Sequence, residues 1–287
     1  MQSVFDELYE NSLAKCEFKN LISIITAEEN IRLAYRNLKK NAGSRTPGTD
    51  GKTIADLAKM SEPELIGFVQ QKFNWYQPQS VRRKEIPKGN GKTRPLGIPT
   101  IMDRLIQQCV LQVMEPICEA KFCETSNGFR PNRGVENALA QAEKHMQKSN
   151  LHIVIDIDIK GFFDNVNHGK LLRQIWAMGI HDKKLLSIIS AMLKAEVAGI
   201  GFPEKGTPQG GILSPLLSNI VLNELDWWIT SQWVGMPTRH EYSGKIHENG
   251  TKDQSKKYRE LRKTNLKECY IVRYADDFKI FCRKHSD

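Results

Sequence analysis

The segment Leu151–Ile159, with the sequence LHIVIDIDI, constrains the fold of this chain more than any other. Leu151 and the isoleucines at every second position after it would line one face of a strand. The β-branched residues favour a strand over a helix at this length. We expect one face of this strand to be buried in an apolar core, while the other face ends in the carboxylates of Asp156 and Asp158.

A second acidic segment is the tetrapeptide YADD, Tyr274–Asp277, between the short runs IVR and FKIF. Apolar and polar residues alternate on both sides, which predicts a tight β-hairpin with the acids at or beside its tip. Neighbouring acids repel each other unless a cation lies between them, and divalent metals would supply that charge. An Asp-Asp turn on a solvated loop has the same sequence pattern, so the tetrapeptide alone leaves both interpretations open.

The strand and the hairpin together could assemble a two-metal site from distant parts of the sequence. Such a site holds two ions about 4 Å apart, which clamp the attacking and leaving oxygens of a phosphoryl displacement. An antiparallel strand with one solvated face needs no metal, and we expect Asp156 to be structural on that ground. For Asp158 we favour a functional role because of the residues that follow it.

Several long blocks resemble reverse transcriptases. Their sequences are most similar to those of the reverse transcriptase/maturase proteins encoded by group II introns. They are DIKGFFD (158–164), GTPQGGILSPLLSNIVLNELD (206–226) and the RYADDF hairpin (273–278). The stretches IPKGNGKTRPLGIPTIMDRLIQQCV (86–110) and SNGFRPNRG (126–134) match the same family's fingers blocks. The resemblance covers nearly the whole chain, in the family's order.

The resemblance implies an α+β fold, the fingers and palm of a right-hand polymerase, with an antiparallel palm sheet packed on helices. Residues 1–80 would be an N-terminal helical extension and the start of the fingers, and residues 81–150 the fingers. Residues 151–287 would be the palm, with a basic insertion near 235–267. The family continues with a thumb that we do not find here, so we expect this piece to extend primers weakly or not at all. Bare apolar palm surface would make a homodimer possible.

The resemblance also implies roles for the acids. Asp158, Asp276 and Asp277 would be the catalytic residues and would bind two Mg²⁺ ions, with a main-chain oxygen near Ile159 completing the metal shell. Oxygen ligands suit Mg²⁺ better than zinc or copper. The reaction would be attack of a primer 3′-hydroxyl on the α-phosphate of a bound deoxynucleoside triphosphate.

A further group would bind the incoming nucleotide or lie beside the primer end: Lys88, Arg94, Phe163, Gln209 and Ala275. By the resemblance, Phe163 lies beneath the deoxyribose and leaves no room for a 2′-hydroxyl. RNA-dependent RNA polymerases of similar design carry an Asp at this spacing, so Phe163 favours DNA synthesis. Without the family, an aromatic ring in the core would explain Phe162 or Phe163 equally well.

The net charge of +9 is concentrated in two segments. Residues 81–104 hold seven Lys/Arg against two acids, and residues 239–267 hold nine against four. Phosphate neutralisation releases counterions, so both segments could bind nucleic acid; solvated loops are the alternative. The candidates, including two from the SNGFRPNRG loop, are Arg82, Arg83, Lys84, Arg130, Arg133, Lys256, Lys257, Arg262 and Lys263.

The expected partners are group II intron RNA, an RNA template with a DNA primer, and dNTPs. No apolar run is long enough to span a bilayer, the acidic N-terminus does not resemble a signal peptide, and six cysteines show no CxxC pair. We therefore expect a nucleic-acid-associated protein of a bacterial or organellar cytoplasm, without membrane contact. Two alternatives remain: a splicing cofactor without polymerase activity, and a retron-type reverse transcriptase. The sequence PQGGILSPLLSNIVLNELD disfavours the second alternative.

Helix starts are predicted where capping residues precede apolar periodicity. Thr26 would cap a helix that carries acids in its first turn, and Asp182 would cap another. Ser61 precedes a helix with Pro63 in its first turn, and this helix would run to about Trp75. On its buried stripe we expect Phe68 among other apolar residues.

Overall fold

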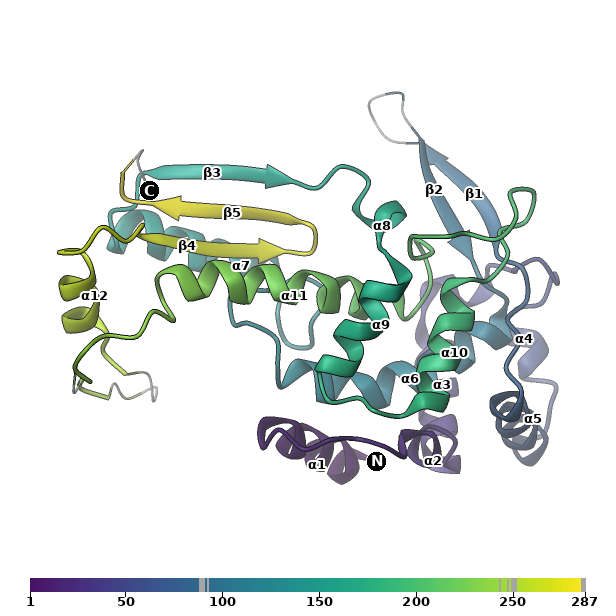
Figure 1. Ribbon diagram of the computed structural model, residues 1–287. Helices are drawn as coiled ribbons and strands as arrows, with labels where there is room; N and C mark the ends of the chain where they lie inside the picture. The colour runs from purple at the N-terminus through teal and green to yellow at the C-terminus, as the bar shows by residue number, and fades with distance from the viewer. Residues whose placement is uncertain (88–90, 92, 243, 247, 249–251, 285–287) are drawn as a thin grey trace. The chain divides into compact units, whose positions relative to one another are not determined.

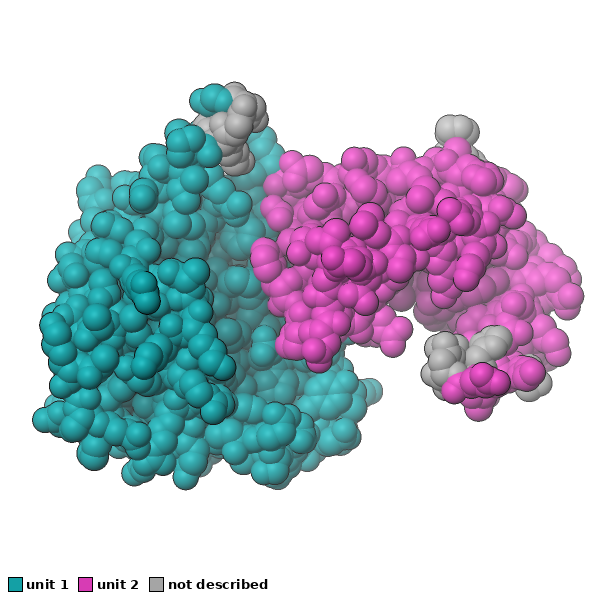
Figure 2. All heavy atoms as spheres, turned by 180° about the vertical axis from the view of Figure 1, so that it is seen from behind, with its two compact units in different colours: residues 1–122, 160–221 teal, residues 123–159, 222–287 magenta. Residues whose placement is uncertain are grey.

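The computed structural model describes residues 1–87, 91, 93–242, 244–246, 248 and 252–284. The chain forms two compact units, which Figure 2 distinguishes by colour. Unit 1 consists of residues 1–122 and 160–221, and unit 2 of residues 123–159 and 222–287. Each unit is therefore built from two separate stretches of sequence. The division into extension, fingers and palm stays a prediction.

Unit 1 is mainly helical and is organised around α6, which packs against α1, α2 and α3. Gln112 on α6 donates to the side chain of Asn30 at 2.8 Å, and Asn30 donates to the carbonyl of Cys109 at 3.1 Å, so the buried amides are satisfied. The elements of this unit are α1 (Gln2–Leu13), α2 (Leu21–Ile25), α3 (Glu28–Lys40), η1 (Ala42–Arg45), α4 (Ile54–Leu57), α5 (Glu62–Asn74), β1 (Arg82–Pro87), β2 (Thr93–Ile98), α6 (Ile101–Glu119), α8 (Phe162–Asn165), α9 (His168–Ala177), α10 (Lys183–Leu193) and the first turns of α11 (Ser214–Gln232).

The predicted helix caps have mixed outcomes. Asp182 accepts a hydrogen bond from the backbone of Leu185, and Ser61 forms a capping box with Glu64, so both predictions are confirmed. The Thr26 prediction is wrong, because its hydroxyl donates back to the carbonyl of Ile22 and the N-cap of α3 is Ala27. Phe68 also departs from expectation, since it remains 38% exposed on α5.

Unit 2 contains a three-stranded antiparallel sheet with the order β3-β5-β4, and β5 lies in the middle (Figure 1). β4 and β5 form the predicted hairpin. Apolar residues on one face of the sheet pack against Leu225 and Ile229 of α11, and residues on the other face pack against α7. The elements are α7 (Val135–Glu143), the π-helical turn η2 (Lys144–Lys148), β3 (Ile153–Asp158), the remainder of α11, α12 (Ser255–Leu261), β4 (Cys269–Tyr274) and β5 (Asp277–Cys282).

The predicted strand forms, but its apolar face is less buried than the alternation suggested. β3 lies at the edge of the sheet, so Ile155 remains 44% exposed. Leu151 precedes the first residue of β3 and does not follow the alternation. It is fully buried against Val272 and Phe281, on the sheet face that contacts α7.

Among the residues that the structure describes, no helix has the length and apolar character to cross a membrane. The six cysteines are free thiols, and only Cys16 is classed as exposed.

Candidate active site

The two acidic segments meet at one end of the sheet in unit 2. β4 ends at Tyr274 and β5 begins at Asp277, so Ala275 and Asp276 form the turn. Asp158, the last residue of β3, is the register partner of Asp277. Directly paired residues of antiparallel strands have Cα atoms about 5 Å apart. Carboxylates separated in sequence by more than a hundred residues are thus neighbours in space.

The acids are open to solvent, and a lysine lies among them. The side chain of Asp277 is 69% exposed. The Lys279 ammonium lies 2.8 Å from Asp156 Oδ1 and 3.8 Å from Asp277 Oδ1, and its hydrogen bond to Asp156 raises the pKa of Lys279. The predicted structural acid, Asp156, is therefore an ion-pair partner of Lys279. In the described part of the chain, no three His, Cys, Asp or Glu side chains are gathered closely enough to hold an ion by themselves.

A fully buried ion pair stabilises the turn between β4 and β5. Arg273 on β4 and Asp226 on α11 are each 0% exposed, and the Arg273 Nη2 to Asp226 Oδ2 distance is 2.6 Å. Arg273 Nε donates to the same carboxylate at 2.8 Å. The third guanidinium nitrogen, Nη1, donates to the carbonyl of Ala275 at 2.7 Å. The position of the turn relative to α11 is thus set by one guanidinium group.

The loop after Cys123 closes on the same turn. The backbone of Asn127 donates to the carbonyl of Arg273 at 2.9 Å. A Cβ on Gly128 would overlap the backbone nitrogen of Ala275 and lie 2.9 Å from its Cα, so only glycine fits there. Ala275 itself has φ +57° and is 6% exposed. Packing therefore explains why the side chain at this position is small. Because Ala275 is buried, the structure gives no support to the predicted contact between Ala275 and the primer end.

Sequence reasoning missed Arg273, Asp226 and Gly128 as parts of this support. Two signals were available: Arg273 interrupts an otherwise apolar and aromatic strand, and Asp226 lies beside apolar residues in the middle of α11. Charged residues in such positions are usually paired when they are buried.

Unit 1 brings together two of the predicted nucleotide-binding residues. Arg94 on β2 donates to the side chain of Gln209 at 2.7 Å, across 115 positions of sequence. The Gly97 amide donates to the carbonyl of Gln209 at 2.6 Å. Gly210 has φ +115°, and a Cβ there would lie 2.6 Å from the Gly97 carbonyl, so the PQGG turn packs closely on β2. Lys88 lies outside the described residues.

Phe163 lies at the start of α8 in unit 1 and is 7% exposed. Its ring makes an edge-on contact with that of Phe162, with centroids 5.4 Å apart. Its carbonyl accepts a hydrogen bond from Thr207 at 2.8 Å, which joins α8 to the loop before Gln209. The ring is thus buried, and its role as a sugar gate stays a prediction.

The basic candidates divide into exposed and engaged side chains. Arg130 is 7% exposed and donates to the carbonyls of Cys123 and Ser126, so it stabilises its own loop and the predicted phosphate contact is not supported. Arg262 is paired with Glu268 at 2.8 Å, and Lys263 with Glu260 at 2.9 Å. Three partly or fully exposed candidates are also engaged: Arg83 pairs with Glu85, Arg133 donates to the Glu124 carbonyl, and Lys257 donates to the Val234 carbonyl. The other partly or fully exposed candidates are Arg82, Lys84 and Lys256.

The ion pair at Arg262 is part of a larger cluster in unit 2. Glu268, with a side chain 5% exposed, also accepts from Arg283 at 2.6 Å. Burial alone would raise the pKa of Glu268, but the hydrogen bonds from the two arginines lower it to about 2. This cluster fixes the start of β4 to the end of β5.

Comparison with known proteins identifies the family. Residues 86–287 match the family model described as reverse transcriptase (RNA-dependent DNA polymerase). The chain is 34% identical over 275 residues to Protein YkfC of Escherichia coli K12, covering 92% of this chain and 71% of YkfC. It is 38% identical over 240 residues to the group II intron-encoded protein LtrA of Lactococcus lactis, covering 79% of this chain and 38% of LtrA.

A third relative comes from a eukaryote. The putative COX1/OXI3 intron 1 protein of Saccharomyces cerevisiae is 28% identical over 308 residues, which cover 96% of this chain and 35% of that protein. This chain thus spans little more than a third of the two intron-encoded relatives.

These matches confirm the predicted α+β polymerase fold and the predicted enzyme class, a nucleotidyltransferase of the RNA-directed DNA polymerase type. They also imply a general dependence on divalent metal ions. The chain belongs to the reverse transcriptase family, and its relatives include intron-encoded proteins such as LtrA.

Proposed function

We propose that this chain carries the polymerase active site of a group II intron-encoded protein, which copies RNA into DNA and also binds its intron RNA as a maturase. The observation that supports the polymerase role most directly is the register pairing of Asp158 with Asp277, next to the turn residue Asp276, at one end of the unit 2 sheet.

The acids suit two Mg²⁺ ions as cofactors. Their donors are carboxylate oxygens, which Mg²⁺ prefers. We assign Asp158, Asp276 and Asp277 as ligands, with the main-chain oxygen of Ile159. Bound there, such ions would lower the pKa of a primer 3′-hydroxyl and would neutralise charge on the triphosphate.

Residues of unit 1 would bind the incoming dNTP. Arg94 is oriented by Gln209, and its remaining donors could bind phosphate oxygens in the bidentate manner of arginine. Phe163, held by its packing on Phe162, would exclude a 2′-hydroxyl. Lys88, which lies outside the described residues, completes the proposed set.

The maturase role rests on the relatives and on charge. LtrA is named as a group II intron-encoded protein, and this chain carries a net charge of +9 with exposed basic residues on β1 and α12. Phosphate contacts of this kind give strong salt-dependent binding to RNA. The corresponding partners are intron RNA and an RNA template with a DNA primer, in a bacterial or organellar host. Pairing of two copies stays a prediction.

A primer-extension assay with paired acid variants, made in the full-length protein, tests the polymerase role. Asp276→Asn is expected to abolish extension on an RNA template while intron splicing is preserved. Asp156→Asn is the matched control, because Asp156 lies on the same strand as Asp158 and pairs with Lys279. Normal extension by Asp276→Asn would contradict the polymerase assignment. Loss of both activities with a lowered melting temperature would show instead that the change unfolds unit 2.

A further inference from the structure

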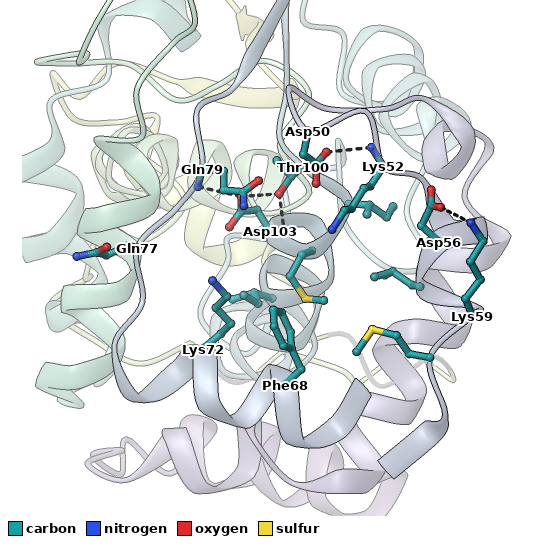
Figure 3. Close-up of a pocket in the computed structure, with 15 residues that line it drawn as sticks. Asp50, Lys52, Asp56, Lys59, Phe68, Lys72, Gln77, Gln79, Thr100 and Asp103 are labelled. Carbon is teal, nitrogen blue, oxygen red and sulfur yellow. Dashed lines mark hydrogen bonds and ion pairs between the residues drawn. The ribbon is translucent and has the colours of Figure 1, made fainter. Parts of the chain in front are cut away.

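A cavity of about 450 Å³ lies within unit 1, and none of the described residues assigned to nucleotide binding above lines it (Figure 3). Its walls come from the loop at residues 50–52, from α4 and α5, from residues 77–79 and from the start of α6. This volume lies in the range of small-molecule sites, which are concave, largely apolar and carry a few polar groups.

The floor of this cavity is apolar and includes an accessible aromatic ring. Phe68 is 38% exposed although it lies on the same helix as the fully buried Val69. Met60 and Met102 are half-buried beside it, and the close-up shows Phe68 extending toward the centre of the cavity. An aromatic ring left open inside a cavity offers a flat surface for stacking.

Two lysines at the rim, Lys52 and Lys72, form no close ion pair with a described residue, although the charge of Lys72 acts to lower the pKa of Asp103. Lys59 is paired with Asp56 at 2.8 Å. In contrast, neither Lys52 nor Lys72 makes a salt bridge with any residue that the structure describes, and the Lys72 ammonium lies 5.5 Å from the centroid of the Phe68 ring. The cavity therefore combines an open ring with two cations that can accept an anionic group.

The one deeply buried acid of the cavity is already satisfied. The carboxylate of Asp103 accepts hydrogen bonds from Thr100 at 2.7 Å, from the Tyr76 hydroxyl at 2.9 Å and from the backbone of Gln79 at 3.1 Å. Burial raises the pKa of Asp103, although these hydrogen bonds oppose the rise. Its role is to fix the 76–79 segment to α6. Two more carboxylates line the cavity, Asp50 and Asp56, and Asp56 is neutralised by its ion pair with Lys59.

We propose that this cavity receives one unstacked nucleotide of a bound RNA, with the base on Phe68 and the flanking phosphates on Lys52 and Lys72. This inference rests on the proposed RNA binding and names a subsite for it. Unpaired bases of loops and bulges are the parts of RNA that proteins stack on aromatic side chains. A free mononucleotide has the same chemistry, and the experiment separates the two sources.

The test measures the affinity of the protein for three versions of one RNA stem: with a single bulged purine, with an abasic residue at the bulge, and without a bulge. Wild-type protein should bind the purine bulge about tenfold more tightly than the abasic bulge, the usual effect of one stacked base. Phe68→Leu keeps the apolar volume and should remove this preference while leaving abasic binding unchanged. Lys52→Gln and Lys72→Gln should each reduce the slope of log affinity against log salt by about 0.9.

Matched controls lie outside the cavity. Trp75→Leu removes a ring that is 78% exposed at the end of the same helix, and Lys40→Gln removes an exposed charge at the end of α3. Neither should change the preference for the bulged purine. Melting temperatures of all variants identify any that fail to fold.

Each outcome has a distinct meaning. Equal affinity of the wild-type protein for purine and abasic bulges would overturn the inference. Saturable binding of free AMP that depends on Phe68, without a bulge preference, would overturn the RNA source and leave a mononucleotide site. Absence of any affinity for RNA would contradict the proposed function itself.

Discussion

The buried pair of Arg273 and Asp226 yields the sharpest prediction about the active site. Both side chains are 0% exposed, and the guanidinium donates to the Asp226 carboxylate through two nitrogens and to the Ala275 carbonyl through a third. Removing one partner of such a pair leaves a buried charge uncompensated, which costs about 3–5 kcal/mol. Asp226→Leu should therefore lower the free energy of unfolding by that amount.

A second change separates stability from positioning. Adding Arg273→Met to Asp226→Leu removes both charges and replaces them with apolar groups, a substitution that is often close to neutral for stability. The double variant also loses the hydrogen bond to the Ala275 carbonyl, so the turn that carries Asp276 is no longer held. We expect the double variant to regain most of the lost stability and yet to extend primers at least tenfold more slowly than the wild-type protein.

The assays are urea unfolding followed by circular dichroism, and primer extension on an RNA template. Glu260→Gln serves as the control, because it removes an exposed ion pair with Lys263 and should have little effect on either measurement. A loss below about 1 kcal/mol for Asp226→Leu would refute the energetic argument. Wild-type extension by the double variant would refute the positioning argument.

Two further predictions concern unit 2. Gly128→Ala should slow primer extension and lower the melting temperature, because its Cβ would overlap the backbone of Ala275; the same change at Gly67, where a Cβ meets nothing within 4 Å, is the control. The folded-state pKa of Glu268 lies near 2, below its ordinary value of 4.5, so its stabilising effect is complete above pH 4.5 and is lost as the pH falls toward 2. Glu268→Gln should remove this part of the acid sensitivity, roughly 1–2 kcal/mol in urea unfolding measured at pH 5 and pH 3, and an unchanged pH dependence would show that the arginines do not hold Glu268 ionised.

Much of the candidate site was accessible from local sequence. The alternation around Asp158 and the short apolar runs around YADD predicted a strand and a hairpin, and both form. Periodicity reports only local conformation, however, and it overestimated how deeply β3 is buried, because edge position in a sheet depends on strand order. The alternation also assigned Leu151 to the wrong face of the sheet, because Leu151 precedes β3 and does not follow the alternation of that strand.

Charge counting had a similar limit. Arg130 and Arg262 contributed to the basic character of their segments, but the first stabilises its own loop and the second is paired with Glu268. Whether a positive charge faces solvent depends on the carbonyls and carboxylates that folding brings to it, which may come from any part of the chain. Composition therefore predicts affinity for nucleic acid better than it identifies the residues responsible.

The sequence by itself determined the family, the acids and the strands that carry them, because these depend on residue types at short spacings. Only the tertiary structure revealed how the turn at Ala275 is held, by a guanidinium whose partner lies 47 positions away, and that Phe68 faces an open cavity. Contacts of this kind join segments that are distant in the chain, and their partners are chosen by packing in three dimensions rather than by any local pattern.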